Sequence, residues 1–144
     1  NGHTETVKAL VQLRADVRAQ DIFGRTALHE AADCGHTETV KALEELGADV
    51  RAQSNYGRTA LHEAALYGRT ETVKALVQRG ADVRAQRKGG YTALHFAAWG
   101  GRTETAKALV QLGADVRAQS NVGWTALHEA ADEGHSETVK VLVQ

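Results

Sequence analysis

Several residue types that define common classes of protein are scarce in this chain. It has 144 residues but no proline, no methionine and a single cysteine, Cys34. One cysteine excludes an internal disulfide framework and favours an intracellular location, cytoplasmic or nuclear. No apolar run approaches the roughly 20 residues that a membrane-spanning helix needs, and no secretory signal is visible at the start. We therefore expect no membrane partner.

The chain also lacks an excess of charge of either sign. The chain has 17 lysines and arginines against 18 aspartates and glutamates, a net charge of −1. This balance gives no bulk electrostatic attraction to nucleic acid, so we expect no nucleic-acid partner either. With 42% hydrophobic and 24% charged residues, the composition suits a soluble folded protein with a continuous core.

What the chain does contain is an internal repeat. Residues 24–29, Gly-Arg-Thr-Ala-Leu-His, return almost unchanged at 57–62, 90–95 and 123–128, always 33 residues apart. A fixed period of this length predicts a stacked array in which each unit contacts only its neighbours. We divide the chain, as a single domain, into a partial unit 1–20, full units 21–53, 54–86 and 87–119, and a partial unit 120–144.

The first full unit, 21–53, illustrates the local structure that we expect. Thr26 is a good N-cap for a short first helix over about 27–34. Thr37 can cap a second helix, which Gly47 ends. Two such short helices are marginal alone, and neither buries its apolar face within one unit. The sequence therefore predicts that stacking of the units completes the core.

The repeated motifs resemble those of the ankyrin repeat family. They are the 33-residue period, which is that family's known period, together with Gly-Arg-Thr-Ala-Leu-His-Glu-Ala-Ala, Gly-His-Thr-Glu-Thr-Val-Lys-Ala-Leu and Gly-Ala-Asp-Val. The resemblance covers essentially the whole chain. It implies an all-α repeat solenoid, a stack of helix-turn-helix units with projecting hairpin loops. It also implies a concave face that binds other proteins.

Some positions depart from the family pattern. Ala27 and its equivalents stand where proline is usual, and Thr39 and its equivalents make the second helix more polar. Arg14 replaces the glycine that ends the second helix in other units, at roughly 1 kcal/mol if that site needs positive φ. Glu44 stands where the other units have valine, and a buried unpaired charge there would be costly.

The units differ mainly at the loop tips and along the first helix. All seven aromatic residues lie at these varying positions: Phe23, Tyr56, Tyr67, Tyr91, Phe96, Trp99 and Trp124. Alanine, valine and leucine build the repeated framework, so we expect that the core does not need the rings. Rigid aromatic side chains on a variable surface are typical of a binding patch. The alternative is that some of them, such as Phe96 or Tyr56, pack between units.

The residues that we predict to contact a partner are taken from these varying positions. They are Ile22, Phe23, Arg25, Asp33, Asn55, Tyr56, Arg58, Leu66, Tyr67, Arg87, Lys88, Tyr91, Phe96, Trp99, Asn121, Val122, Trp124 and Asp132. In the resembling family, the corresponding positions line the concave groove. The chain is thus similar either to an engineered or evolved binder on a regular scaffold, or to a natural array formed by recent duplication.

The sequence offers little that could carry catalysis or hold a cofactor or metal. His29 and its equivalents follow the period, so they form a row and cannot converge on one ion. We expect each ring to bond to the threonine three residues earlier and to loop backbone. Cys34 has no repeating partner, and a glycine turn separates it from His36, the base nearest in sequence. Arg18 and its equivalents could grip an acidic partner, but we favour pairing with Asp16 and its equivalents.

Three hypotheses for function follow. The leading one is a non-enzymatic protein–protein interaction module that binds a partner in the concave groove of loop tips and first helices. The alternative is a structural scaffold that self-associates end to end through uncapped termini, because polar capping units are missing. An enzyme is the third, and it lacks any converging constellation of catalytic residues.

Overall fold

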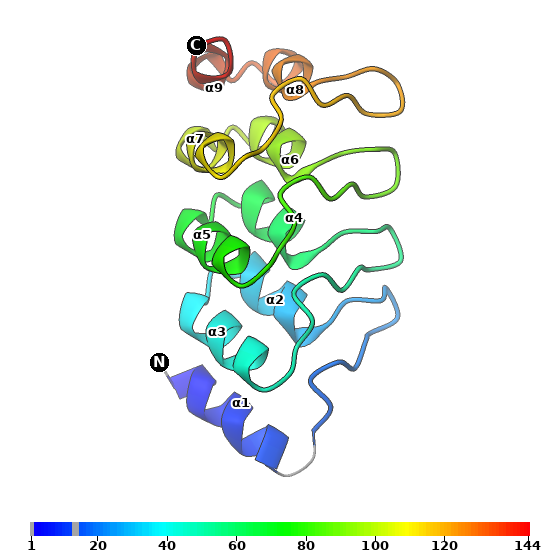
Figure 1. The fold of residues 1–144 in the computed structure, drawn as a ribbon, viewed down its shortest axis with the longest axis vertical. Helices are drawn as coiled ribbons and strands as arrows, with labels where there is room; N and C mark the ends of the chain where they lie inside the picture. Colours follow the sequence, from blue (N-terminus) through cyan, green and yellow to red (C-terminus); the bar gives the residue numbers. More distant parts are fainter. Residues whose placement is uncertain (1, 13–14) are drawn as a thin grey trace.

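The computed structural model describes residues 2–12 and 15–144, and these residues form helices joined by loops, with no strand (Figure 1). The helices are α1 (Gly2–Gln12), α2 (Ala27–Asp33), α3 (Thr37–Glu45), α4 (Ala60–Leu66), α5 (Thr70–Gln78), α6 (Ala93–Trp99), α7 (Thr103–Gln111), α8 (Ala126–Asp132) and α9 (Ser136–Leu142). The predicted all-α repeat solenoid is confirmed. Within the described ranges, no helix has the length and apolar character to cross a bilayer.

The helices lie in two layers (Figure 1). The first helices of the units, α2, α4, α6 and α8, form one layer, and α1, α3, α5, α7 and α9 form the other. Each helix packs against its equivalent in the next unit, and α2 to α9 also pack in pairs within a unit. The loops between units project together from one side of the stack. A face is thereby formed by loop tips and first helices.

Small aliphatic side chains build the core, as the repeat predicts. Leu28, Leu61 and Leu94 are almost fully buried at equivalent positions of α2, α4 and α6, and Leu76 is buried in the second layer. Alanines such as Ala65 are also fully buried, which lets neighbouring helices approach closely.

Phe96 is an exception to the expectation that the core does not need the aromatic rings. Only 7% of its surface is exposed, and it belongs to the buried cluster. Its ring lies 5.1 Å from the imidazole of His62 in the preceding unit. The neighbouring units have glutamate at this position, Glu63 and Glu129, so Phe96 fills with a ring a space that carries a carboxylate elsewhere. The alternative, packing between units, is right for this residue.

Buried histidines join each unit to the next. The backbone N–H of Thr59 donates to His62 Nδ1 at 3.0 Å, so Nδ1 is unprotonated and Nε2 carries the hydrogen. His62 Nε2 then donates to the carbonyl oxygens of Ala85 and Tyr91 at 3.1 and 3.2 Å. His29 and His95 bond in the same way to Arg58 and Trp124 of the following units. The prediction of local bonding to threonine and loop backbone is confirmed.

Threonine hydroxyls form a second set of bonds between units. The expected capping role of Thr37 is wrong, because α3 begins at this residue and His36 occupies the N-cap. The Thr37 hydroxyl instead lies 2.7 Å from that of Thr72 in the next unit. Thr70–Thr105 and Thr103–Thr138 repeat the contact. The threonines that make the second helix more polar are therefore buried with a hydrogen-bond partner.

Arg18 and Arg51 link neighbouring units through hydrogen bonds to backbone rather than through ion pairs. Asp16 accepts a hydrogen bond from the backbone N–H of Arg18, and Arg18 Nε donates to the carbonyl of Gly47 at 2.9 Å. Arg51 bonds to Gly80 in the same way. The expected pairing of the arginine and aspartate side chains is thus replaced by a bond to the next helix end. Gly47 has φ of +103°, so the helix end does need positive φ, whereas Arg14 lies outside the described residues.

Glu44 is neither buried nor unpaired. Its side chain is 32% exposed and forms an ion pair with Arg79 of the following unit. Arg79 is itself a departure, because Leu46 and Leu112 stand at the equivalent positions. Two substitutions in the repeat pattern therefore compensate each other across the boundary between units.

Candidate functional site

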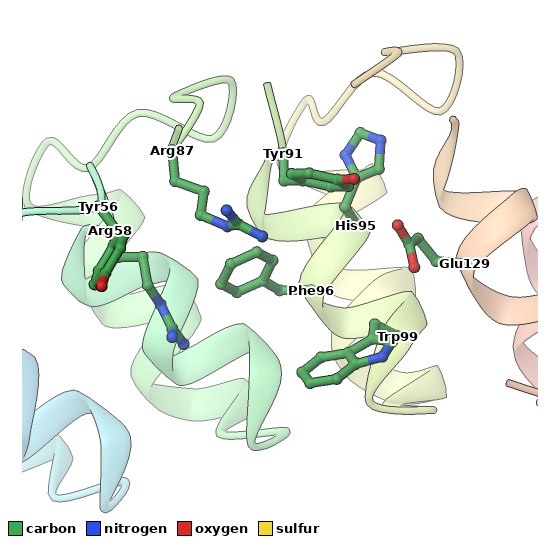
Figure 2. A pocket seen from close by; sticks show the side chains of 8 residues that line it. All are labelled: Tyr56, Arg58, Arg87, Tyr91, His95, Phe96, Trp99 and Glu129. Carbon is green, nitrogen blue, oxygen red and sulfur yellow. The ribbon is translucent and has the colours of Figure 1, made fainter. Parts of the chain in front are cut away.

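Two adjoining hollows lie on the surface made by the loop tips and the first helices, which we call the loop–helix face. The main hollow has a volume of about 380 Å³ and is lined by Tyr56, Arg58, Arg87, Tyr91, His95, Phe96, Trp99 and Glu129 (Figure 2). The adjoining hollow is lined by Phe23, Arg25, Asp33, Ser54, Tyr56, Arg58, Glu63 and Tyr67. Tyr56 and Arg58 line both, so the two hollows lie side by side across neighbouring units.

The floor of the main hollow is the ring of Phe96, which is in cation–π contact with Arg58 and Arg87. The Arg58 guanidinium carbon lies 4.9 Å from the centroid of Phe96, and that of Arg87 lies 5.4 Å from it. Arg87 also lies 4.6 Å from the ring of Tyr91. Cation–π contacts of this kind are worth roughly 0.5–2 kcal/mol, depending on burial. They fix both arginines over the aromatic floor.

A partly buried ion pair holds Arg58 from the other side. Its Nε lies 2.9 Å from Glu63 Oε1, and its Nη2 donates a hydrogen bond of 3.2 Å to Oε2. Only 5% of Glu63 is exposed. Burial raises the pKa of Glu63, and the charge of Arg58 opposes that shift only in part. Arg58 is therefore a fixed part of the wall.

Trp99 is the most accessible ring of the main hollow, apart from Tyr56 at its rim. It is 49% exposed, and its indole N–H donates to Glu133 at 3.2 Å. Tyr91, by contrast, packs against the core and meets the His95 ring edge-on at 5.5 Å. The main hollow thus combines rigid rings with one exposed indole whose orientation is set by a hydrogen bond.

Ten of the eighteen predicted contact residues line these two hollows: Phe23, Arg25, Asp33, Tyr56, Arg58, Tyr67, Arg87, Tyr91, Phe96 and Trp99. Asn55, Lys88 and Asn121 line a third recess, between the loop tips, which shares Arg87 with the main hollow. Ile22 and Val122 are highly exposed at the tips, and Asp132 is exposed at the end of α8.

Three predicted residues have structural contacts that were not expected. Asn55 donates through its side chain to the carbonyl of Ile22 and so ties two loop tips together. Leu66 packs against the core rather than lining either hollow. Trp124 stacks on His128 with 5.7 Å between ring centroids.

Sequence reasoning missed His95, Glu63 and Glu129. His95 belongs to the repeated framework, so comparing the units gives no reason to place it at a site. The glutamates carried a signal, because they follow the shared histidine at a position where the units differ. The role of Glu63 depends on Arg58, five residues earlier, whereas Trp124 stands at that position before Glu129.

No metal centre accompanies these hollows in the part of the chain that the structure describes, since no three His, Cys, Asp or Glu residues converge there. Cys34 is exposed. The chemistry that the face offers is therefore aromatic surface, fixed guanidinium groups and carboxylates.

Helix pairs stacked with a constant period, with variable side chains gathered on one face, define a helical repeat protein. A family model of ankyrin repeats in three copies matches residues 1–87 and 79–144. The chain belongs to the ankyrin repeat family, whose general role is protein–protein interaction. No curated protein sequence shows significant similarity to the chain.

Proposed function

We propose that this chain is a non-enzymatic binding module that holds a protein partner in the concave groove formed by the loop–helix face. The proposal rests on where the repeated and the varying residues lie. Repeated residues such as Leu61 and His62 are buried in the stack. Residues that vary between units, such as Tyr56, Arg87 and Trp99, gather round the main hollow.

The rigidity of the face supports the proposal. Arg58 is held by Glu63 on one side and covers Phe96 on the other. Side chains that are already fixed lose little conformational entropy when a partner binds. Trp99, which is half exposed beside these fixed groups, is the anchor that we expect to contribute most.

The test compares Trp99→Ala with a control of similar exposure. Affinity for a captured and identified partner is measured by isothermal titration calorimetry, alongside urea unfolding of each variant. Trp99→Ala should weaken binding by about 2 kcal/mol or more, while changing the free energy of unfolding by no more than roughly 0.5–1 kcal/mol. Val110→Ala, at an exposed site on α7 in the other layer, should alter neither. Equal affinity of the Trp99 variant and the parent would refute the assignment.

Apolar surface at the two ends of the stack favours self-association as a second candidate. Leu28, Leu61 and Leu94 are buried by the following unit, whereas the equivalent Leu127 is 36% exposed. At the opposite end, a hollow beside α1, α2 and α3 is lined partly by Val7, Ala31 and Leu43. A contact between these different surfaces would be head-to-tail and would build open chains.

Light scattering over a wide concentration range tests this second candidate. A mass that rises with concentration, and that Leu127→Lys returns to the monomer value, would support end-to-end assembly. A monomer at every concentration would exclude it. The Trp99 comparison is independent of this result, because Trp99 lies on the loop–helix face.

A further inference from the structure

Two units of the chain already hold a guanidinium group on the loop–helix face through ion pairs. In the unit that begins at 21, Arg25 Nη2 lies 3.4 Å from Glu30 Oε2 and 3.6 Å from Asp33 Oδ2. In the next unit, Arg58 pairs with Glu63. The arginine follows the shared glycine, and the glutamate follows the shared histidine.

The last unit keeps the carboxylates but not the arginine. Glu129 and Asp132 occupy the positions of Glu30 and Asp33, while Trp124 stands where the arginine would be. Across residues 2–12 and 15–144, neither carboxylate has an ion pair or a side-chain hydrogen bond. In the unit before it, both positions changed together, to Tyr91 and Phe96. The last unit therefore has an acceptor for a guanidinium group without the group itself.

The surroundings of Glu129 form a receptacle rather than an open surface. Figure 2 shows its carboxylate directed towards the space between Tyr91 and Trp99, within the main hollow. Burial and the neighbouring Asp132 and Glu133 carboxylates raise the pKa of Glu129, and Arg87 across the hollow only partly opposes them. A cation placed beside Glu129 would offset both the repulsion from Asp132 and Glu133 and the cost of burying the charged carboxylate. His128 also lowers the pKa of Glu129, but by less than Arg87 does.

We propose that the main hollow binds an arginine side chain of the partner, with the guanidinium group between Tyr91 and Trp99 and paired with Glu129. Asp132 supplies a second carboxylate, as Asp33 does for Arg25. Arginine fits better than lysine because a planar guanidinium both stacks on rings and meets carboxylates with two N–H groups. The inference rests on the proposed function, since it names the group by which a partner is held.

The test uses N-acetyl-arginine amide as the probe and indole N–H resonances as reporters. The chain has two tryptophans, so a ¹⁵N-labelled sample gives two indole signals, and Trp99→Ala assigns them. Titration should shift the Trp99 signal with a dissociation constant on the order of millimolar. N-acetyl-lysine amide should bind more weakly, and the citrulline analogue, which has the shape of arginine without its charge, should not bind.

Two variants and one matched control test the contribution of the Glu129 carboxylate. Glu129→Gln should weaken arginine binding about fivefold, whereas Glu137→Gln, on α9 and paired with Lys140, should not alter it. Trp124→Arg should restore the internal pair seen in the earlier units and abolish binding of the probe. The folding of each variant is checked by its thermal melt. An unchanged affinity in Glu129→Gln, or an equal response to citrulline, would overturn the inference.

The outcomes also separate this inference from the function on which it rests. If Trp99→Ala weakens partner binding but arginine amide does not shift the Trp99 signal, the face binds its partner through other chemistry and the inference is wrong. If Trp99→Ala leaves partner binding unchanged, the proposed function is wrong whatever the probe does.

Discussion

The buried histidines should make the stability of the stack depend on pH. Burial lowers the pKa of His62 to about 4, and it lowers the pKa values of His29 and His95 in the same direction. Geometry adds a reason at His62, because a proton on Nδ1 would face the backbone N–H of Thr59. In the unfolded chain, each imidazole regains its ordinary pKa of about 6.5.

The sign of the effect follows from which state takes up protons first. As the pH falls below about 6.5, the unfolded state is protonated while folded His62 remains neutral. The free energy of unfolding should therefore fall as the pH falls, by about 1 kcal/mol at pH 5.5 and about 3 kcal/mol in full for this one residue. Glu63 acts in the opposite direction, because burial raises its pKa and the folded state gains a proton first.

Urea unfolding at pH 7.5, 6.5 and 5.5 measures this dependence. We expect His62→Gln to be less stable than the parent at pH 7.5 but to lose less stability on acidification, by about 1 kcal/mol at pH 5.5. Since Glu63 is present in both proteins, its contribution cancels in the comparison. Leu61→Ala is the matched control, destabilised by core truncation but retaining the full pH dependence. Equal slopes for His62→Gln and the parent would refute the reasoning.

Three comparisons by urea unfolding, which use four substitutions, test the packing of the stack. Leu61→Ala removes a side chain that is 1% exposed and should cost roughly 2–5 kcal/mol, so an unaltered melt would contradict its place in the core. Gly80→Ala should cost about 1 kcal/mol, because φ is +101° there although space for a methyl group exists, and a neutral result would argue against backbone strain. Glu44→Val and Arg79→Leu should each destabilise alone but couple favourably together, by up to about 1 kcal/mol, whereas strict additivity would show that their ion pair contributes nothing.

Most of the fold could be predicted from the sequence because each position of the repeat occurs in several units and can be compared between them. The leucine of the first helix, which is buried in α2, α4 and α6, recurs in every unit that contains a first helix, and so do the threonine before it and the histidine after it. A position that never varies must satisfy the same packing requirement in each unit. The glycine at a helix end, such as Gly47, was predictable for the same reason.

The candidate site was predictable only in outline. The varying positions indicated which face to consider, and ten of the residues chosen there line the hollows. They did not indicate that Phe96 would be buried, because its environment is made by Arg58 and His62 of the preceding unit. A residue at a variable position can face solvent or a neighbour, and the neighbour's identity decides which.

By itself, the sequence determined the period, the helices and the small aliphatic side chains that join one unit to the next, because these are properties of each unit and of its copies. Only the tertiary structure decided which residues act together across units. Glu44 with Arg79, Thr37 with Thr72 and Arg58 over Phe96 are separated by 35, 35 and 38 positions along the chain. Stacking brings each pair together, because residues about one period apart become neighbours when the units pack.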